Sequence, residues 1–221
     1  MNGGKIMLKK LFFVLTAFLA FNVTVFASSA NIDLREYQQS PKILNVMAAP
    51  FENDNFHIAT FNFDQQQTED KLNFYQGICL IDKDNNKLNP LNVKKIITTG
   101  TQSSEIVLNK QKQPPYKQDY RQVQTTSSRP QNYLGGDSNN IVYLGKFKII
   151  TKAGTFDDCI GIKIYNDKTG EGMVQYLAKG YGVVYMEGIK ADGTAEEIAH
   201  LEEIHPLEDE DISSFKTKYF I

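Results

Sequence analysis

Apolar and polar residues alternate with a period of two through much of the last third of the chain. The alternation is clearest in four short segments: 141–149, 160–164, 173–179 and 182–189. Successive side chains of a strand point to opposite faces, so this period predicts strands with one buried face. The residues between the segments are rich in Gly, Asp, Asn and Lys, as in tight turns, at 152–154, 166–170 and 191–194. Short strands joined by short turns predict an antiparallel meander.

Residues 195–204 allow two interpretations. They are rich in Glu, Ala and Leu, and helix propensity alone favours a helix there. However, the pair Asp192-Gly193 lies between two runs that contain apolar residues, which is a strong hairpin signal. We therefore expect 195–204 to be a further strand.

The first half of the chain is less regular but also predicts strands, at 57–63, 73–81, 93–98 and 105–108, with a turn at 82–87. Residues 109–138 are dense in Gln, Pro, Ser and Thr and poor in aliphatic side chains. This long polar loop is expected to be either a mobile flap or a connector between two halves of a sheet. The first half has too few apolar runs to close a core alone, so we expect one β-rich domain over 28–221.

The N-terminus has the pattern of a secretory signal peptide. Three lysines among the first ten residues precede the apolar run 11–21, and small residues follow around Ala27. The run is shorter than the roughly 20 residues that a membrane span needs. No cysteine lies near the expected cleavage site, so the usual lipoprotein anchor is not expected. We expect cleavage of 1–27 and a secreted or periplasmic protein without a stable membrane anchor.

Charge excludes one broad class of partner. Removal of 1–27 takes away three lysines and no acidic residue, so 21 basic and 26 acidic residues remain, a net charge of −5. Many of the acids crowd the C-terminal end, which we interpret as a solvated face. Such a chain has no basic footprint for nucleic acid.

Two motifs in the C-terminal part are similar to a known group of proteins. They are AGTFDDCIGI at 153–162 and YLAKGYGVV at 176–184, followed by the hairpin around Asp192-Gly193. This part resembles exported bacterial proteins of unassigned function with a GTFxDC…YxAKGxGVV pattern. Those proteins resemble the lipoprotein-carrier (LolA-like) half-barrel class. The resemblance covers residues 152–204. It implies a curved antiparallel sheet of the half-barrel type. With the period-two segments and the polar segment 109–138, we expect a mainly β fold: a single curved antiparallel sheet of half-barrel or clam-like shape, with a long polar flap and little helix. The resemblance brings no catalytic residue.

The two cysteines have two open interpretations. Export would place Cys79 and Cys159 in an oxidising compartment, where a disulfide could contribute on the order of 4 kcal/mol. Both also lie in strand-like runs, where either could be a buried free thiol.

Other candidate chemistry is weak. His200 and His205 are close to several glutamates, but positions five apart do not share a face of a strand or a helix, so no metal site is expected. No nucleophile elbow and no phosphate-binding loop is found. We expect no enzyme activity and no cofactor.

The aromatic content is the best indication of function. The expected strands carry more Tyr and Phe than a thin sheet needs if one face is solvated. The first interpretation is that these aromatic side chains simply fill the core, which is their commonest role. The functional alternative is a curved sheet with an apolar groove on its concave side, which we expect to be lined by Tyr143, Phe147, Ile162, Tyr176 and Tyr185. The expected function is a non-catalytic envelope protein that binds a lipid, an acyl chain or an envelope protein there. The alternative is a secreted protein-interaction module with no small-molecule ligand.

Overall fold

The computed structural model describes residues 32–48, 56–82, 87–100, 103–108, 116–118, 131–132 and 139–220. The expected signal peptide at 1–27 and most of the polar loop at 109–138 lie outside these residues. All statements of structure below concern the described part of the chain.

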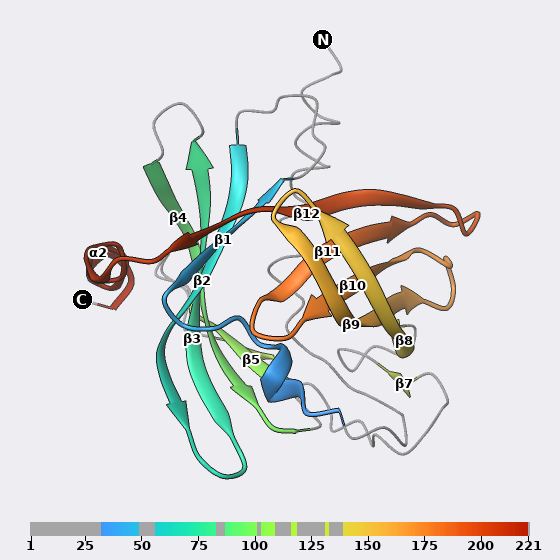
Figure 1. The fold of residues 1–221 in the computed structure, drawn as a ribbon. Coiled ribbons are helices and arrows are strands. Elements are labelled where there is room, and N and C mark those ends of the chain that lie inside the picture. The colour runs from blue at the N-terminus through green and yellow to red at the C-terminus, as the bar shows by residue number, and fades with distance from the viewer. Residues whose placement is uncertain are drawn as a thin grey trace.

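The described residues form one mainly antiparallel, curved and open sheet with little helix, as the sequence predicts (Figure 1). The first half contributes β1 (Ile43–Ala48), β2 (Phe56–Gln67), β3 (Leu72–Asp82), β4 (Lys87–Thr98), β5 (Ser103–Leu108) and β6 (Tyr116–Gln118). The second half contributes β7 (Gln131–Asn132), β8 (Asn139–Thr151), β9 (Gly154–Asn166), β10 (Gly172–Ala178), β11 (Gly182–Ile189) and β12 (Ala195–Pro206). A 3-10 helix, η1 (Leu34–Tyr37), precedes β1, and the helix α2 (Asp209–Phe220) follows β12.

The strand order is β6-β5-β4-β3-β2-β1-β12-β11-β10-β9-β8-β7. Each half is therefore a meander, and the two meanders are joined by the pairing of the first strand with the last. In that pairing Val46 is opposite Glu203 and Met47 is opposite Leu201. The polar loop starts beyond β5 and ends before β8, with β6 at one edge of the sheet and β7 at the other. Most of 109–138 lies outside the described residues, so the choice between a flap and a connector stays a prediction.

The meander over β8–β12 is confirmed, and 195–204 is a strand within β12. The turns before β9 and before β11 use glycines in the left-handed region, since φ is 146° at Gly154, 75° at Gly180 and 72° at Gly182. Five of the described elements were not predicted: β1, β6, β7, η1 and α2.

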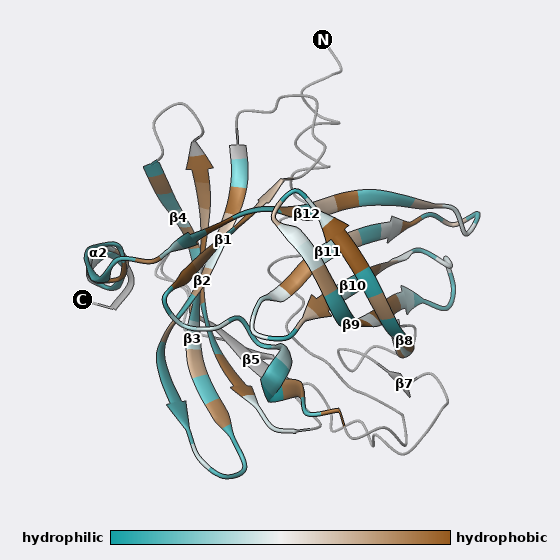
Figure 2. Ribbon diagram, in the orientation of Figure 1, coloured by the Kyte–Doolittle hydropathy of each residue, from teal (hydrophilic) through white to brown (hydrophobic). Residues whose placement is uncertain are grey.

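Two apolar clusters lie on opposite faces of the first half of the sheet. On β2, Ile58 belongs to the interior cluster, whereas Ala59 and Phe61 belong to the outer one. The interior cluster fills the concave side with residues of both halves, among them Leu34, Met47, Ile160, Leu177 and Met186. Figure 2 shows that hydrophobic stretches lie where strands cross the middle of the molecule and that the projecting hairpin ends are hydrophilic.

The helix α2 covers the outer cluster. Its Phe215 ring lies 5.0 Å from the Phe61 ring and 6.0 Å from the Phe63 ring, both with edge-to-face geometry. Lys216 Nζ lies 2.6 Å from Asp64 Oδ1 and anchors the helix to β2. Three acids in the first turn and Lys218 in the last turn suit the helix dipole. The acid-rich C-terminal end is therefore the start of a packed helix with its acids exposed.

Each half has a glycine beneath a phenylalanine ring. A Cβ atom at Gly77 would lie 2.5 Å from Phe61 Cζ, and one at Gly161 would lie 2.6 Å from Phe147 Cε2. Since packed side chains do not approach this closely, glycine at these positions allows the rings to lie flat on the neighbouring strand.

We predict that Gly77→Ala destabilises the protein by about 1–3 kcal/mol, because the added methyl group displaces the buried Phe61 ring. Urea unfolding followed by circular dichroism measures this. The matched control is Gly100→Ala, where the nearest atom to an added Cβ is 3.7 Å away and the change should stay within about 0.5 kcal/mol. Equal stability of the two variants would contradict the packing argument.

Candidate functional site

Three of the five residues predicted to line a groove do lie together. Tyr176 and Tyr185 are directly opposite each other on β10 and β11, with ring centroids 5.7 Å apart. The Phe147 ring lies 5.1 Å from the Tyr176 ring. The Tyr176 hydroxyl donates to Glu187 Oε2 at 2.9 Å. These half-buried rings form a packed row on one face of the second half of the sheet.

The other two residues lie elsewhere. Ile162 is 1% exposed and is opposite Gln175, so it faces the interior, on the other side of the sheet from Tyr176. Tyr143 is partly buried and lies directly opposite Ile162 in the pairing of β8 with β9, so it is on the same face as Ile162. The predicted set is thus divided between two faces of the sheet and does not line one groove.

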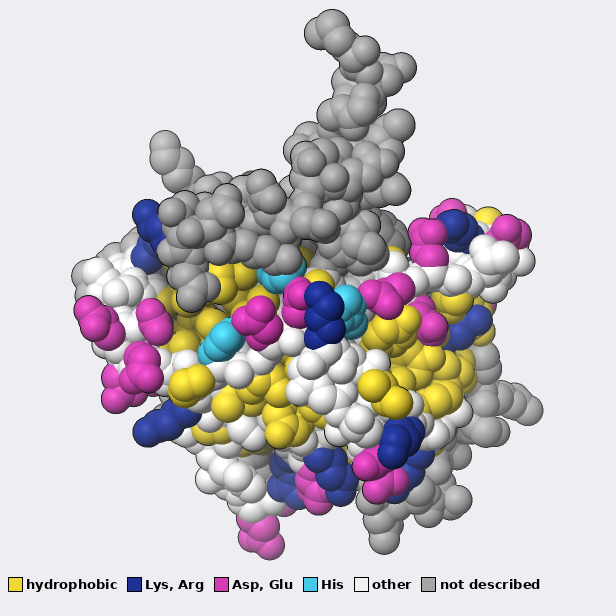
Figure 3. All heavy atoms as spheres, turned by 45° about the horizontal axis from the view of Figure 1, so that its top comes forward, with side chains coloured by type: hydrophobic (Ala, Val, Ile, Leu, Met, Phe, Trp, Pro, Cys, Tyr) yellow, Lys and Arg dark blue, Asp and Glu magenta, His cyan; other side chains and the backbone are white. Residues whose placement is uncertain are grey.

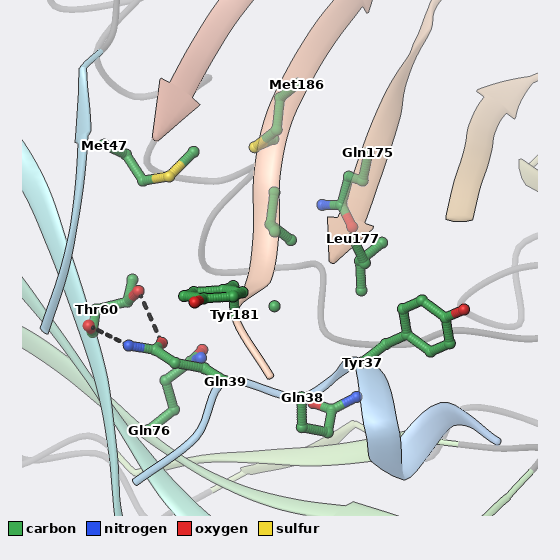
Figure 4. Close-up of a pocket in the computed structure, with 12 residues that line it drawn as sticks. Tyr37, Gln38, Gln39, Met47, Thr60, Gln76, Gln175, Leu177, Tyr181 and Met186 are labelled. Atoms are coloured by element: carbon green, nitrogen blue, oxygen red, sulfur yellow. Dashed lines mark hydrogen bonds between the residues drawn. The ribbon is translucent and has the colours of Figure 1, made fainter. Parts of the chain in front are cut away.

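The concave side is closed by its own side chains. The cavity there is lined by residues of η1, of β1–β3 and of β10–β11, and its volume is about 30 Å³. That is room for about one water molecule. Figure 4 shows the side chains converging from the two halves.

Amide groups organise this interior (Figure 4). Gln39 Nε2 donates to the carbonyl oxygens of Ile43 and Thr60 at 3.0 and 2.8 Å, and Gln39 Oε1 accepts from the Thr60 hydroxyl at 3.1 Å. Asn62 Nδ2 donates to the Gln39 carbonyl at 2.7 Å, and Gln76 Nε2 donates to Asn62 Oδ1 at 3.3 Å. Buried polar groups that satisfy one another in this way fix a single arrangement. The cavity that the described residues enclose on the concave side is therefore too small for an acyl chain.

A larger cleft lies on the opposite face, between α2 and the first residues of β4. Its volume is about 400 Å³, within the range of small-molecule sites. Its apolar lining is Phe61, Leu88, Pro90 and Phe215. Its polar lining is Lys87, Asp211, Ser214 and Lys218. We call this cleft the α2 groove.

Local sequence explains how the groove forms. Asp211, Ser214, Phe215 and Lys218 are spaced three, four and seven residues apart, so they share one face of α2. Phe215 is 3% exposed and holds that face against β2. The sequence signal for α2 was a helical spacing of apolar residues after four consecutive acids. The acids alone had been interpreted as a solvated face.

The two cysteines are free thiols in different clusters. Cys79 lies in the outer cluster with Ala59 and Phe61, and Cys159 lies in the interior cluster, where its Sγ donates to the Phe156 carbonyl at 3.4 Å. The structure therefore has the free-thiol alternative and not the disulfide. Burial raises the pKa of Cys79 to about 12 and that of Cys159 to about 11. A buried thiol with a raised pKa is a poor nucleophile.

The histidines pair with acids of β12. His57 Nε2 lies 3.1 Å from Glu202 Oε2, His200 Nδ1 lies 2.6 Å from Glu197 Oε1, and His205 Nε2 lies 2.6 Å from Glu203 Oε2. Figure 3 shows a band of histidine and acidic side chains above exposed hydrophobic ones. Within the described ranges, no group of three or more His, Cys, Asp or Glu side chains could hold a metal ion.

No family model matches the chain, and no curated protein matches it. Two solved structures are similar in fold. One is a proposed exported protein with a YmcC-like fold from Bacteroides fragilis, with 10% identity and a TM-score of 0.46 over 76% of this chain and 97% of that chain. The other is a proposed lipoprotein from Parabacteroides distasonis, with 11% identity and a TM-score of 0.46 over 80% of this chain and 100% of that chain.

We predict that iodoacetamide alkylates both cysteines slowly in the native protein at pH 8 and rapidly in 8 M urea, without a reductant. The raised pKa values favour the neutral thiol in the folded state, and unfolding restores a pKa near about 8.5. Peptide mass spectrometry measures each site separately. Recovery of a Cys79–Cys159 disulfide peptide, or rapid native alkylation of both thiols, would contradict the burial described above.

Proposed function

We propose that this is an exported, non-catalytic protein that binds an apolar ligand, such as an acyl chain, in the α2 groove. The observation that carries the proposal is the size and lining of that groove. Its volume is about 400 Å³, and the partly exposed Leu88 and Pro90 are among the apolar side chains that line it. No cavity of this size is described beside Phe147, Tyr176 and Tyr185, the packed row of rings that the sequence analysis expected to bind the ligand.

Export rests on the N-terminal sequence, since the lysines, the apolar run and the small residues around Ala27 follow the order of a cleaved signal. Among the described residues, no helix is long and apolar enough to cross a membrane. A protein released into the cell envelope meets lipids and their acyl chains, for which the α2 groove has suitable dimensions.

The non-catalytic part of the proposal rests on the candidate nucleophiles. Both thiols are buried and have raised pKa values. Among the described residues, the polar side chains that line the α2 groove are Lys87, Asp211, Ser214 and Lys218. Binding explains such a lining more directly than catalysis does.

A second candidate function is protein interaction through β8. Ile150 is 72% exposed and Leu144 is 41% exposed, and large apolar side chains of that exposure are common at protein interfaces. Size-exclusion chromatography with light scattering on wild type and on Ile150→Lys tests it. A wild-type complex that the substitution dissociates supports this function, and identical monomers argue against self-association through β8.

We predict that Ser214→Phe weakens binding of decanoate by about tenfold or more, a loss of about 1.4 kcal/mol, because the new ring occupies the α2 groove. Native mass spectrometry and calorimetric titration measure the bound fraction and the affinity. This variant adds volume to the groove and removes no core contact, so its fold should be retained.

The matched control is Ser213→Phe, which places the same ring one residue away on the same helix, outside the residues that line the groove. It should bind decanoate as the wild type does. Equal affinity of the two variants, or no decanoate binding by the wild type, would refute the α2 groove as the ligand site.

A further inference from the structure

The packed row of rings in the second half of the sheet has two carboxylates beside it. Tyr176 and Tyr185 are the middle of that row, and Glu187 follows Tyr185 by two residues on β11, so its side chain lies on the same face. Glu187 is directly opposite Glu197 in the pairing of β11 with β12. Residues opposite each other in an antiparallel pair share a face, so both carboxylates adjoin the rings. We call this face, with its two tyrosines and two glutamates, the tyrosine face.

A bulge in β12 places the two glutamates opposite each other. Met186 pairs with Ala199, and the next pair is Glu187 with Glu197, so Ile198 is the extra residue. Ile198 is 9% exposed, whereas the Glu197 side chain is 39% exposed. Like charges directly opposite on neighbouring strands destabilise a sheet. A cation bound between the two carboxylates would relieve this repulsion.

Hydrogen bonds hold the carboxylates in place beside the rings. The Tyr176 hydroxyl donates to Glu187 Oε2 at 2.9 Å. On the other strand, His200 Nδ1 lies 2.6 Å from Glu197 Oε1. Burial raises the pKa of Tyr185 to about 12, with the Glu197 and Glu187 carboxylates as further causes, so its hydroxyl stays neutral. Since a carboxylate offers about four acceptor positions, these contacts leave acceptors for a ligand.

Two lysines near this face have partners of their own. Lys163 Nζ lies 4.9 Å from the centre of the Tyr165 ring, and Lys190 Nζ lies 2.7 Å from Glu196 Oε2. Lys163 is two strands from Glu187, so about 10 Å separates their backbones. The Lys163 contact is an ammonium group over a tyrosine ring, within this same half of the sheet.

We propose that the tyrosine face binds a primary alkylammonium group, as carried by a free amine or by a lysine side chain, with its nitrogen between the Glu187 and Glu197 carboxylates. Its methylene chain lies on the Tyr176 and Tyr185 rings. The ammonium group supplies N–H donors to the carboxylates, and its charge is attracted to the ring faces. A quaternary ammonium group lacks the donors, and an alcohol lacks the charge. The tyrosine face and the α2 groove lie on different halves of the sheet, so binding at one does not depend on binding at the other.

Nuclear magnetic resonance titration of the isotope-labelled protein with n-pentylammonium at pH 7 tests the proposal. The backbone amide signals of the two tyrosines and two glutamates should shift, with an affinity in the millimolar range. Pentan-1-ol and tetramethylammonium should each bind about fivefold more weakly or less, because exposed ion pairs and cation–π contacts contribute modestly. Binding of Nα-acetyl-lysine amide at the same residues would assign lysine side chains as ligands, and binding of the amine alone would assign free amines.

The carboxylates are tested by the double variant Glu187→Gln/Glu197→Gln. The amide oxygens still accept hydrogen bonds, but pentylammonium affinity should fall about fivefold, to that of pentan-1-ol, because the charges are gone. The control Glu69→Gln/Glu171→Gln removes the same charge from two exposed turns and should leave the affinity unchanged.

The rings are tested by Tyr185→Leu, which should weaken pentylammonium binding about two- to fivefold. Tyr185→Phe keeps the ring and should retain the affinity, which separates the loss of the ring from the loss of the hydroxyl. The matched control is Tyr165→Leu, because the ring of Tyr165 already contacts Lys163. This control should bind pentylammonium as the wild type does.

Four results would overturn the proposal. They are equal affinity for pentylammonium and pentan-1-ol, signal shifts that map to α2 and not to β10–β12, full affinity in the glutamate variant, and full affinity in Tyr185→Leu. An equal loss in the glutamate control pair would also refute the site, since the effect would then be one of net charge. None of these results bears on decanoate binding in the α2 groove, which is measured separately.

Discussion

The pairing of β1 with β12 is the interaction on which the rest of the structure depends. Each meander by itself would end in an unpaired edge strand, which exposes backbone donors and acceptors. Joining the first strand to the last removes both of these edges and makes one sheet. The chain before β1 reinforces the junction, since Gly180 N donates to the Glu36 carbonyl at 2.8 Å and Ser40 N donates to the Gly180 carbonyl at 2.7 Å.

The same pairing decides where the groove forms. β12 crosses from the second half to the first and continues directly into α2, so the helix is delivered to the outer face of β2–β4 (Figure 1). A single helix covers only part of that face. Phe215 contacts Phe61 and Phe63, while the start of β4 lies beside the helix and remains partly exposed. The cleft left between them is the α2 groove.

The sequence predicts the second half of the fold better than the first, for a physical reason. Parts of strands β8–β12 show apolar residues at alternate positions in the sequence, and tight turns rich in Gly, Asp and Asn separate these strands. In β1 the four consecutive residues from Leu44 to Met47 are all buried. This strand is therefore buried on both faces and shows no alternation. The α2 groove could not be predicted, because Phe61, Leu88 and Phe215 come from three elements that only the tertiary fold brings together.

The curvature of the sheet and the ligand site have separate physical roles. A curved sheet suggests binding on its concave side, yet here that side holds an apolar cluster. It also holds a hydrogen-bond network in which the Gln39 side chain donates to the Thr60 carbonyl and the Asn62 side chain donates to the Gln39 carbonyl. Opening such a network to admit a chain would leave buried polar groups unpaired, which costs more than the chain contacts return. The interface of α2 with β4 has no such network among its described contacts, and it is bounded by one short helix. The α2 groove therefore differs from the concave side in that its walls meet through the packing of one helix on the sheet.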